Sequence, residues 1–236
     1  MKLSSRIVTP LIKALLSMLC RIDADAMRLV PHTGPLIIVT NHVNFLEVPI
    51  IYTQLFPRDA IGLAKRETWD NPLLGALANT WSAIPLDRGA TDLRAMRMAL
   101  QSLDDGKLLV LAPEGSRSVD GRLRRGHGGV VQIALRSGAP ILPVAHTGGE
   151  QFWGNLKHLR RTDFSLRVGQ PFVLVRPDDD DGQLSIGREM RTQMADAVMR
   201  RLALLLPPER RGVYAEAPAE PDRCIRVLGN PGGAPV

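Results

Sequence analysis

The stretch LIIVT at residues 36–40 is an uninterrupted apolar run, rich in β-branched side chains, that follows a turn at Gly34-Pro35. A run of this kind, bounded by turn residues, predicts a strand that is buried on both faces. Five more runs of the same character predict strands at residues 60–64, 82–86, 108–112, 141–145 and 164–168. Because helical patterns separate several of these strands, we expect an α/β fold: a mostly parallel central sheet flanked by helices.

Apolar residues at helical spacing predict helices at residues 92–103, 130–136 and 186–205. The last of these ends before Pro207-Pro208, and prolines then recur among charged and small residues. That composition predicts a surface tail with little regular structure. We therefore divide the chain into an N-terminal amphipathic helix at 1–28, a central domain at 29–206 and a Pro-rich C-terminal tail at 207–236.

The N-terminal segment predicts a helix over residues 3–20, because its apolar residues recur at helical spacing and Lys2, Arg6, Lys13 and Arg21 interrupt them. Lys13 stands inside the apolar phase, so a helix that lies in the membrane interface fits better than one that spans the bilayer. A helix docked on the protein's own core remains the alternative. No small-residue cleavage site follows, so a cleaved signal peptide fits poorly.

The net charge of +6 and the sequence pI of about 9.9 favour an anionic partner, whether nucleic acid, anionic lipid or a phosphorylated metabolite. Only 4% of the residues are aromatic, which argues against a stacking surface for single-stranded nucleic acid. No nucleic-acid-binding motif is present either. The two cysteines, Cys20 and Cys224, lie in regions that we do not expect to meet, which fits a reducing compartment.

His42 and Glu47 form the first candidate pair, directly after the strand at 36–40. Five residues on a regular helix would turn the two side chains apart, so they can pair only if His42 lies in the turn before a helix or at its first residue. Glu47 would then hold the Nδ1 proton and leave Nε2 as a general base. The alternative is a histidine at a helix start beside an exposed glutamate.

The second candidate region, APEGSRS at residues 112–118, follows another buried strand. Gly115 allows a sharp turn, and Arg117 offers a fixed cation for an anion. The Asp87-Arg88 pair repeats this arrangement after the strand at 82–86. Because sites in open α/β sheets form beyond the carboxyl ends of strands, we expect these motifs to converge. Taken alone, they also fit solvated surface arginines or a structural ion pair.

A basic, Gly-rich stretch follows at residues 122–129, where Arg122, Arg124 and Arg125 precede Gly126 and His127. A helix that starts there would favour an anion, but the stretch matches neither nucleotide-binding glycine pattern. His127 and His146 have no partners at metal-ligand spacing, so we interpret both as ordinary residues and expect no metal. A serine-hydrolase elbow, Gly-x-Ser-x-Gly, is absent.

In this order and spacing, the motifs over residues 30–150 resemble those of the glycerolipid acyltransferases, specifically the 1-acylglycerol-3-phosphate acyltransferase family. Asn41-His42 to Glu47 matches the Asn-His-x-x-x-x-Asp block, with Glu in place of Asp. Asp87-Arg88 matches the second block and 112–118 the third, with Ala112 in place of Phe. The apolar run around a proline at 141–144 matches the fourth.

The resemblance implies a glycerol-3-phosphate acyltransferase-like fold and acyl transfer without an acyl-enzyme. It implies His42 as the base, Glu47 as the group that orients it, and Arg88, Glu114, Gly115 and Arg117 as the phosphate-binding residues. It implies no cofactor: acyl-CoA or acyl carrier protein (acyl-ACP) is the donor substrate and a lysophospholipid the acceptor. It also favours a peripheral location at the cytoplasmic face of the cell membrane, on an anionic surface, and an acyltransferase domain at 29–206.

Three competing hypotheses remain open. The glutamate at position 47 suggests a non-catalytic lipid-binding relative. An acyltransferase that acts on a different hydroxyl or amine acceptor is a further alternative. A nucleic-acid-binding protein rests on the basic pI alone, and we do not expect nucleic acid as a partner.

Overall fold

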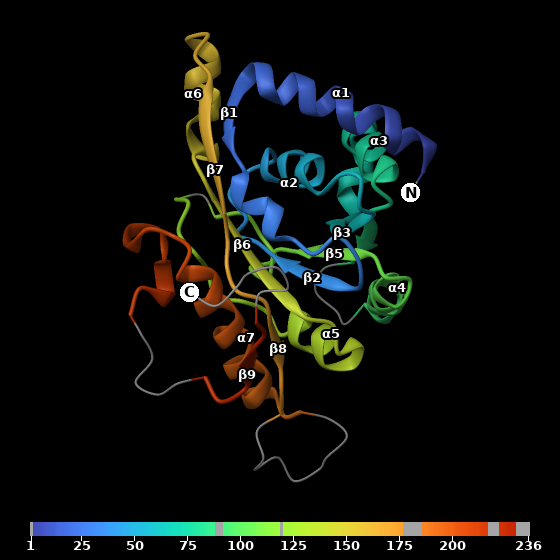
Figure 1. The fold of residues 1–236 in the computed structure, drawn as a ribbon, viewed down its shortest axis with the longest axis vertical. Coiled ribbons are helices and arrows are strands. Elements are labelled where there is room, and N and C mark those ends of the chain that lie inside the picture. Colours follow the sequence, from blue (N-terminus) through green and yellow to red (C-terminus); the bar gives the residue numbers. More distant parts are fainter. Residues whose placement is uncertain (1, 88–91, 119, 177–185, 217–221, 230–236) are drawn as a thin grey trace.

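A computed structural model of the chain describes residues 2–87, 92–118, 120–176, 186–216 and 222–229. These residues form an α/β fold with a central, mostly parallel sheet between two layers of helices, as the sequence predicted (Figure 1). The seven α-helices of the described residues are α1 (Leu3–Leu19), α2 (Glu47–Leu55), α3 (Pro72–Thr80), α4 (Leu93–Asp104), α5 (Gly129–Ser137), α6 (Phe152–Lys157) and α7 (Arg188–Ala203).

All six predicted strands are present: β2 (Leu36–Val39), β3 (Ala60–Lys65), β4 (Ile84–Leu86), β5 (Leu108–Leu111), β6 (Ile141–Thr147) and β7 (Thr162–Val168). Three strands were not predicted: β1 (Cys20–Asp23), β8 (Phe172–Leu174) and β9 (Ile225–Val227). The strand order is β1-β7-β6-β2-β5-β3-β4, with β8 beside β6 and β9 beside β8. Pairing is antiparallel only where β6 meets β7 and β8 and where β8 meets β9.

Strand β2 is buried on both faces, as its apolar run predicted. Ile37 and Val39 face one core, into which α4, α5 and α7 pack. Leu36 and Ile38 face a second core, which α1 and α2 cover. Side chains alternate between the faces of a strand, so each layer of helices packs against every second residue. The site at the end of β2 therefore stands on a strand that is fixed from both sides.

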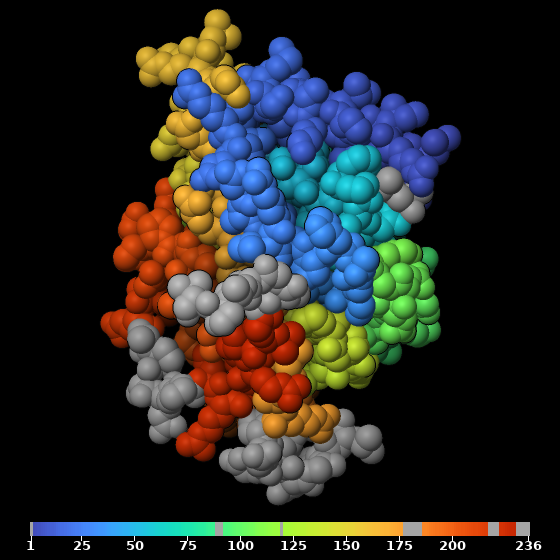
Figure 2. Space-filling view, viewed as in Figure 1, coloured from blue at the N-terminus to red at the C-terminus, as the bar shows by residue number. Residues whose placement is uncertain are grey.

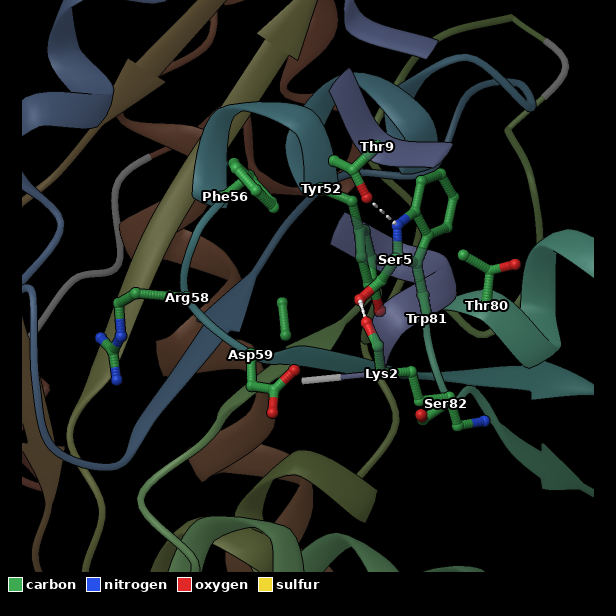
Figure 3. A pocket seen from close by; sticks show the side chains of 11 residues that line it. Lys2, Ser5, Thr9, Tyr52, Phe56, Arg58, Asp59, Thr80, Trp81 and Ser82 are labelled. Carbon is green, nitrogen blue, oxygen red and sulfur yellow. Dashed lines mark hydrogen bonds between the residues drawn. The ribbon is translucent and has the colours of Figure 1, made fainter. Parts of the chain in front are cut away.

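Helix α1 buries Ser5, Thr9 and Leu16 and turns most of its large apolar residues outward. Ser5 and Thr9 are buried, and Trp81 Nε1 donates to Thr9 Oγ1 at 3.1 Å (Figure 3). The exposed side chains recur every three or four residues: Leu3, Ile7, Leu11, Leu15 and Met18. This helix lies on the outside of the molecule, along one end (Figure 2). It thus packs on the core through one side and leaves an apolar stripe exposed on the other.

The end of α1 is joined to the sheet without a linker. Leu19 is the last helical residue, and Cys20 is the first residue of β1, which pairs with β7. Arg161 donates to the carbonyl oxygens of Ser17 at 2.6 Å and of Cys20 at 2.7 Å. The direction of the helix is therefore fixed relative to the sheet.

The C-terminal segment, 207–236, has more structure than its composition predicted. Two short 3-10 helices at Pro208–Arg210 and Gly212–Tyr214 pack beside α7, and β9 adds a strand to the sheet. Tyr214 is buried in a third cluster with Leu123 and residues of α7. Pro207 and Pro208, which follow shortly after α7, do not prevent this packing: Pro208 begins the first of the two 3-10 helices.

Candidate active site

Three neighbouring parallel strands bring the predicted motifs to one edge of the sheet. Strand β2 pairs with β5 on one side and β6 on the other, so all three have their carboxyl ends at the same edge. Residues 41–46 leave β2, 112–118 leave β5 and 148–151 leave β6. The predicted convergence of the first two motifs is confirmed, and β6 adds a third loop.

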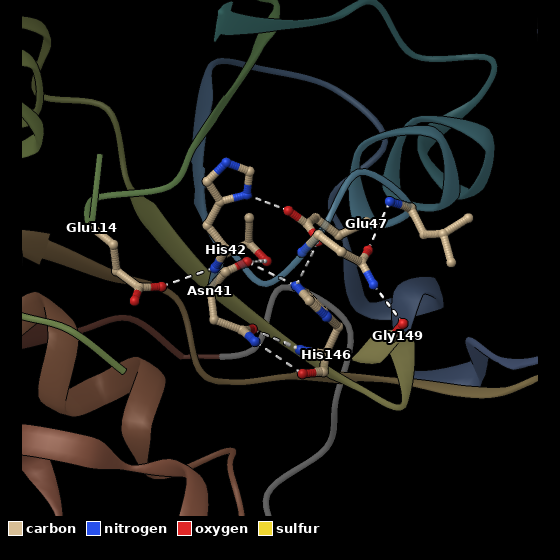
Figure 4. A network of polar contacts seen from close by, with 9 residues as sticks. Asn41, His42, Glu47, Glu114, His146 and Gly149 are labelled. Atoms are coloured by element: carbon tan, nitrogen blue, oxygen red, sulfur yellow. Dashed lines mark hydrogen bonds and ion pairs between the residues drawn. The ribbon is translucent and has the colours of Figure 1, made fainter. Parts of the chain in front are cut away.

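His42 and Glu47 pair, which is the first of the two alternatives that the sequence left open. His42 lies in the loop before α2, and Glu47 is the first residue of that helix. The Nδ1 atom of His42 contacts Glu47 Oε1 (Figure 4). The other carboxylate oxygen, Oε2, accepts from the main-chain N–H of Asn44 at 2.9 Å. Glu47 is 1% exposed, so its carboxylate is held by these groups and not by bulk water.

This pairing leaves the far nitrogen of the His42 ring available. A carboxylate oxygen only accepts, so Nδ1 is the donor in this contact, and the tautomer that donates from Nδ1 has its lone pair on Nε2. No group of the described residues hydrogen-bonds Nε2. The side chain is 20% exposed, which makes it accessible from outside. The arrangement has the geometry of a general base with an orienting carboxylate.

Glu114 lies behind His42. Its Oε1 accepts from the main-chain N–H of His42 at 2.9 Å, and its Oε2 accepts from that of Arg124, also at 2.9 Å. The side chain is 2% exposed, and burial raises the pKa of the carboxyl. We had assigned Glu114 to phosphate binding, but both oxygens face main-chain amides. In this geometry the carboxylate joins the His42 loop to the basic loop at 122–125.

The turn after β5 has the conformation that its glycine predicted. Gly115 has φ +67°, and a Cβ there would lie 2.9 Å from Cδ2 of the His127 ring. The Ser118 N–H then donates to the His42 carbonyl oxygen at 2.7 Å. Arg117, between Gly115 and Ser118 in the sequence, is exposed and has no hydrogen bond or ion pair with the described residues. Its guanidinium is free to meet an anion.

Of two further arginines from the sequence prediction, Arg124 and Arg88, only Arg124 lies in the described residues. Arg124 Nη1 donates to Ser116 Oγ at 2.9 Å, which adds a second cation beside Arg117. Arg88 lies outside the described residues. Its neighbour Asp87 forms a bidentate pair with Arg66, which also holds the pKa of the Asp87 carboxyl below its usual range.

His146 belongs to the polar network, although we had interpreted it as an ordinary residue. The Asn41 side chain exchanges hydrogen bonds with the His146 main chain at 3.0 and 2.9 Å. The His146 ring then donates through Nε2 to the Asn41 carbonyl oxygen at 2.8 Å, and the same nitrogen lies 3.7 Å from Glu47 Oε2. Burial lowers the pKa of His146, which favours the neutral ring. Its Nδ1 has no hydrogen-bond partner among the described residues. The nearest sequence signal was its place at the end of a predicted strand.

Among the described residues, no three His, Cys, Asp or Glu side chains gather in a way that could hold a metal ion. At the same edge of the sheet, the accessible Nε2 of His42 and the cations of Arg117 and Arg124 lie on loops that are hydrogen-bonded to one another.

Comparison with known proteins identifies the family. Residues 21–147 match the model of the family described as Acyltransferase. The chain belongs to this acyltransferase family. The matched part begins in β1 and ends with β6, so it contains His42, Glu47, Glu114 and His146. The segment after residue 147 in this acyltransferase lies outside the match.

Individual relatives agree with this assignment. Over 120 residues, this acyltransferase is 35% identical to the 1-acyl-sn-glycerol-3-phosphate acyltransferase of Limnanthes alba, a match of 50% of this chain but 42% of that protein. The chain thus spans less than half the length of that relative. It is 31% identical over 209 residues to the lyso-ornithine lipid O-acyltransferase of Pseudomonas aeruginosa, covering 88% of this chain and 70% of the relative.

A solved structure shares the fold. The crystal structure of the 1-acyl-sn-glycerophosphate acyltransferase PlsC from Thermotoga maritima superposes with a TM-score of 0.60, at 23% identity, over 85% of this chain and 79% of that one. At this identity the likeness shows a common α/β fold with a central, mostly parallel sheet. No helix of the described residues is both long enough and apolar enough to cross a membrane.

Proposed function

We propose that this protein transfers a fatty acyl group from an acyl thioester to the free hydroxyl of a lysophospholipid, with His42 as the general base. The observation that carries the proposal is the His42–Glu47 pair: a buried carboxylate fixes Nδ1, and Nε2 is accessible without a partner among the described residues. The glutamate in place of aspartate is compatible with catalysis, because its longer side chain reaches both His42 and the N–H of Asn44.

In the proposed step, His42 takes up one proton and later gives it back. Nε2 of His42 takes the proton of the acceptor hydroxyl as its oxygen attacks the thioester carbonyl carbon. The C–S bond then breaks, and the leaving thiolate takes the proton back from Nε2. Glu47 stabilises the imidazolium that exists between these events, because its negative charge lies against Nδ1. No covalent acyl-enzyme is required.

The cations beside His42 support an anionic acceptor. In this proposal Arg117, with Arg88, binds the phosphate of the acceptor, and Gly115 permits the turn that presents Arg117. Glu114 contributes by fixing the main chain on which His42 and Arg124 stand. The expected acceptor is 1-acylglycerol-3-phosphate, since the resemblance of the motifs points to it.

A second acceptor is favoured by a specific observation. The relative that matches over 88% of this chain is named a lyso-ornithine lipid O-acyltransferase. A lyso-ornithine lipid also offers a free hydroxyl to a general base, but it carries no phosphate. The two acceptors therefore differ in whether they offer a phosphate for Arg117 to bind.

We also place the protein at the membrane, as a peripheral protein of the cytoplasmic face. The exposed apolar stripe of α1 supports this location, because a lipid acceptor resides in a bilayer and the stripe has no partner in the described residues. The basic residues of this helix, such as Arg6 and Lys13, suit an anionic surface.

The decisive experiment pairs two acceptors, 1-acylglycerol-3-phosphate and lyso-ornithine lipid, with acyl-CoA and acyl-ACP donors. We expect transfer by the native protein and its loss in His42→Ala with the fold retained. His32→Ala is the matched control, because His32 is exposed and lies before the opposite end of β2. Undiminished turnover in His42→Ala refutes the proposed base. Lipid binding without transfer from either donor supports the non-catalytic hypothesis instead.

A further inference from the structure

The segment 207–214, which lies outside the family match, is bonded directly to the basic loop. The Leu123 N–H donates to the Arg210 carbonyl oxygen at 2.9 Å, and the Val213 N–H donates to that of Leu123 at 3.4 Å. The Gly126 N–H donates to the Tyr214 hydroxyl at 3.0 Å, and this hydroxyl donates in turn to Asp196 of α7 at 2.7 Å. The loop is thus held at both of its ends.

The same loop holds the site from its other side. Arg124, between Leu123 and Gly126, gives its N–H to Glu114, and Glu114 accepts from the N–H of His42. A short series of hydrogen bonds therefore runs from Tyr214 through the loop and Glu114 to the main chain of His42. Each donor and acceptor in it is main chain or largely buried.

Arg210 provides a second connection. Its Nη1 donates to the Asp120 carbonyl oxygen at 3.2 Å, and its Nη2 forms an ion pair with Glu150. Gly149, next to Glu150, accepts from the side chain of Asn44, whose N–H binds Glu47. One arginine thus joins the loop after β5 to the loop after β6, and both loops border His42.

We propose that residues 208–214 are a positioning element of the acyl-transfer site, in which Tyr214 and Arg210 fix the loops that set the main chain of His42. This inference rests on the proposed function. It goes beyond it because the residues lie more than sixty positions after the end of the family match at 147. A displacement of about 1 Å at a reacting group can cost roughly 100-fold in rate, so the segment acts on catalysis without touching substrate.

The test uses Tyr214→Phe, which removes the hydroxyl and keeps the ring, in the full chain. The matched control is Tyr52→Phe: Tyr52 is the other tyrosine of the chain, also buried, on α2 and outside this series of contacts. For each variant we would measure urea unfolding, steady-state transfer and amide hydrogen exchange.

In Tyr214→Phe we expect the amide protons of Gly126, Arg124 and His42 to exchange roughly tenfold faster, as for one lost hydrogen bond. We also expect kcat to fall by roughly 10- to 100-fold, with little change in the donor KM.

A second variant distinguishes an effect on the position of the His42 loop from a general loss of stability. Arg210→Gln removes the ion pair at a side chain that is 27% exposed, and we expect the same direction of change in kcat. Equal changes in kcat and in His42 exchange for Tyr214→Phe and Tyr52→Phe would overturn the inference, as would faster exchange confined to Gly126. If the native protein shows no transfer at all, the proposed function fails. The exchange of the His42 amide still decides whether the segment positions this loop.

Discussion

Glu47 holds the ring of His42 from the first turn of the helix that follows it. The carboxylate contacts Nδ1 through one oxygen and the N–H of Asn44 through the other, while His146 approaches it to 3.7 Å. A single buried side chain thus orients the ring and closes the loop that carries it.

Changing Glu47 separates these two effects. In Glu47→Gln the charge is lost, and we expect kcat to fall by roughly 10²- to 10⁴-fold because the imidazolium is no longer stabilised. In Glu47→Asp the charge stays, but the shorter side chain cannot reach both His42 and Asn44, so we expect an intermediate loss. Steady-state kinetics measure both, with Glu189→Gln, an exposed change on α7, as the control. Native kcat in Glu47→Gln contradicts the orienting role.

Glu114→Gln tests the carboxylate behind His42. Both oxygens of Glu114 accept from main-chain N–H groups, and an amide nitrogen in place of one oxygen faces a donor. We expect the free energy of unfolding to fall by about 1–3 kcal/mol, the cost of an unsatisfied buried polar group. Urea unfolding at neutral pH gives this value. An unchanged midpoint would show that the two contacts contribute nothing to stability.

Gly115→Ala tests the turn that presents Arg117, and Gly106→Ala is its matched control. Both glycines have positive φ, +67° and +73°, so both variants incur the conformational cost of about 1–2 kcal/mol. Only at Gly115 does the new Cβ also meet a side chain, the ring of His127. We therefore expect a larger loss of stability, and lower transfer, in Gly115→Ala alone. Identical losses in thermal unfolding and equal activities argue against a close contact there.

His146 makes stability depend on pH. Its pKa in the folded protein lies below that of an unfolded histidine, so the unfolded state binds the proton first. The stability that this neutral ring contributes is fully present above pH 6.5 and is lost as the pH falls toward the folded pKa. The slope is at most about 1.4 kcal/mol per pH unit. Urea unfolding between pH 5 and 8 should show a steeper rise for the native protein than for His146→Gln; parallel curves contradict the assignment.

Leu11→Glu tests the apolar stripe of α1. Leu11 is 65% exposed, so the change costs little stability, but it places a negative charge where we expect anionic lipid. Sedimentation with vesicles of mixed neutral and anionic phospholipid should show much weaker binding. Leu204→Glu is the control: Leu204 is also 65% exposed, but it ends α7 on the other side of the sheet. Equal binding by the two variants would rule out α1 as the contact surface.

The sequence predicted the strands that have long, uninterrupted apolar runs, such as β2 and β6, because burial on both faces leaves a clear pattern. It did not predict β1 or β9, which have four and three residues, include charged side chains and pair with strands far along the chain. The C-terminal segment was misjudged for a related reason. Its packing depends on Tyr214 and on main-chain bonds to Leu123, and neither leaves a periodic signal.

Within the site, the His42–Glu47 pair was predictable because the two residues are close in sequence and follow a strand. The link between Asn41 and His146 was not, because it joins residues 105 positions apart through main-chain groups. The contacts of Glu114 were not predictable for the same reason: its partners are main-chain N–H groups, which every residue except proline carries. Motifs thus predicted the His42–Glu47 pair and missed much of what holds it.

The direct passage from α1 into β1 bears on how the molecule meets a surface. With no hinge between Leu19 and Cys20, and with Arg161 bound to both sides of the junction, the helix cannot tilt independently. Any surface that grips the outer side of α1 therefore also dictates the angle of the sheet. If α1 binds a membrane as proposed, the depth of the helix in the membrane also sets the height of His42 above it.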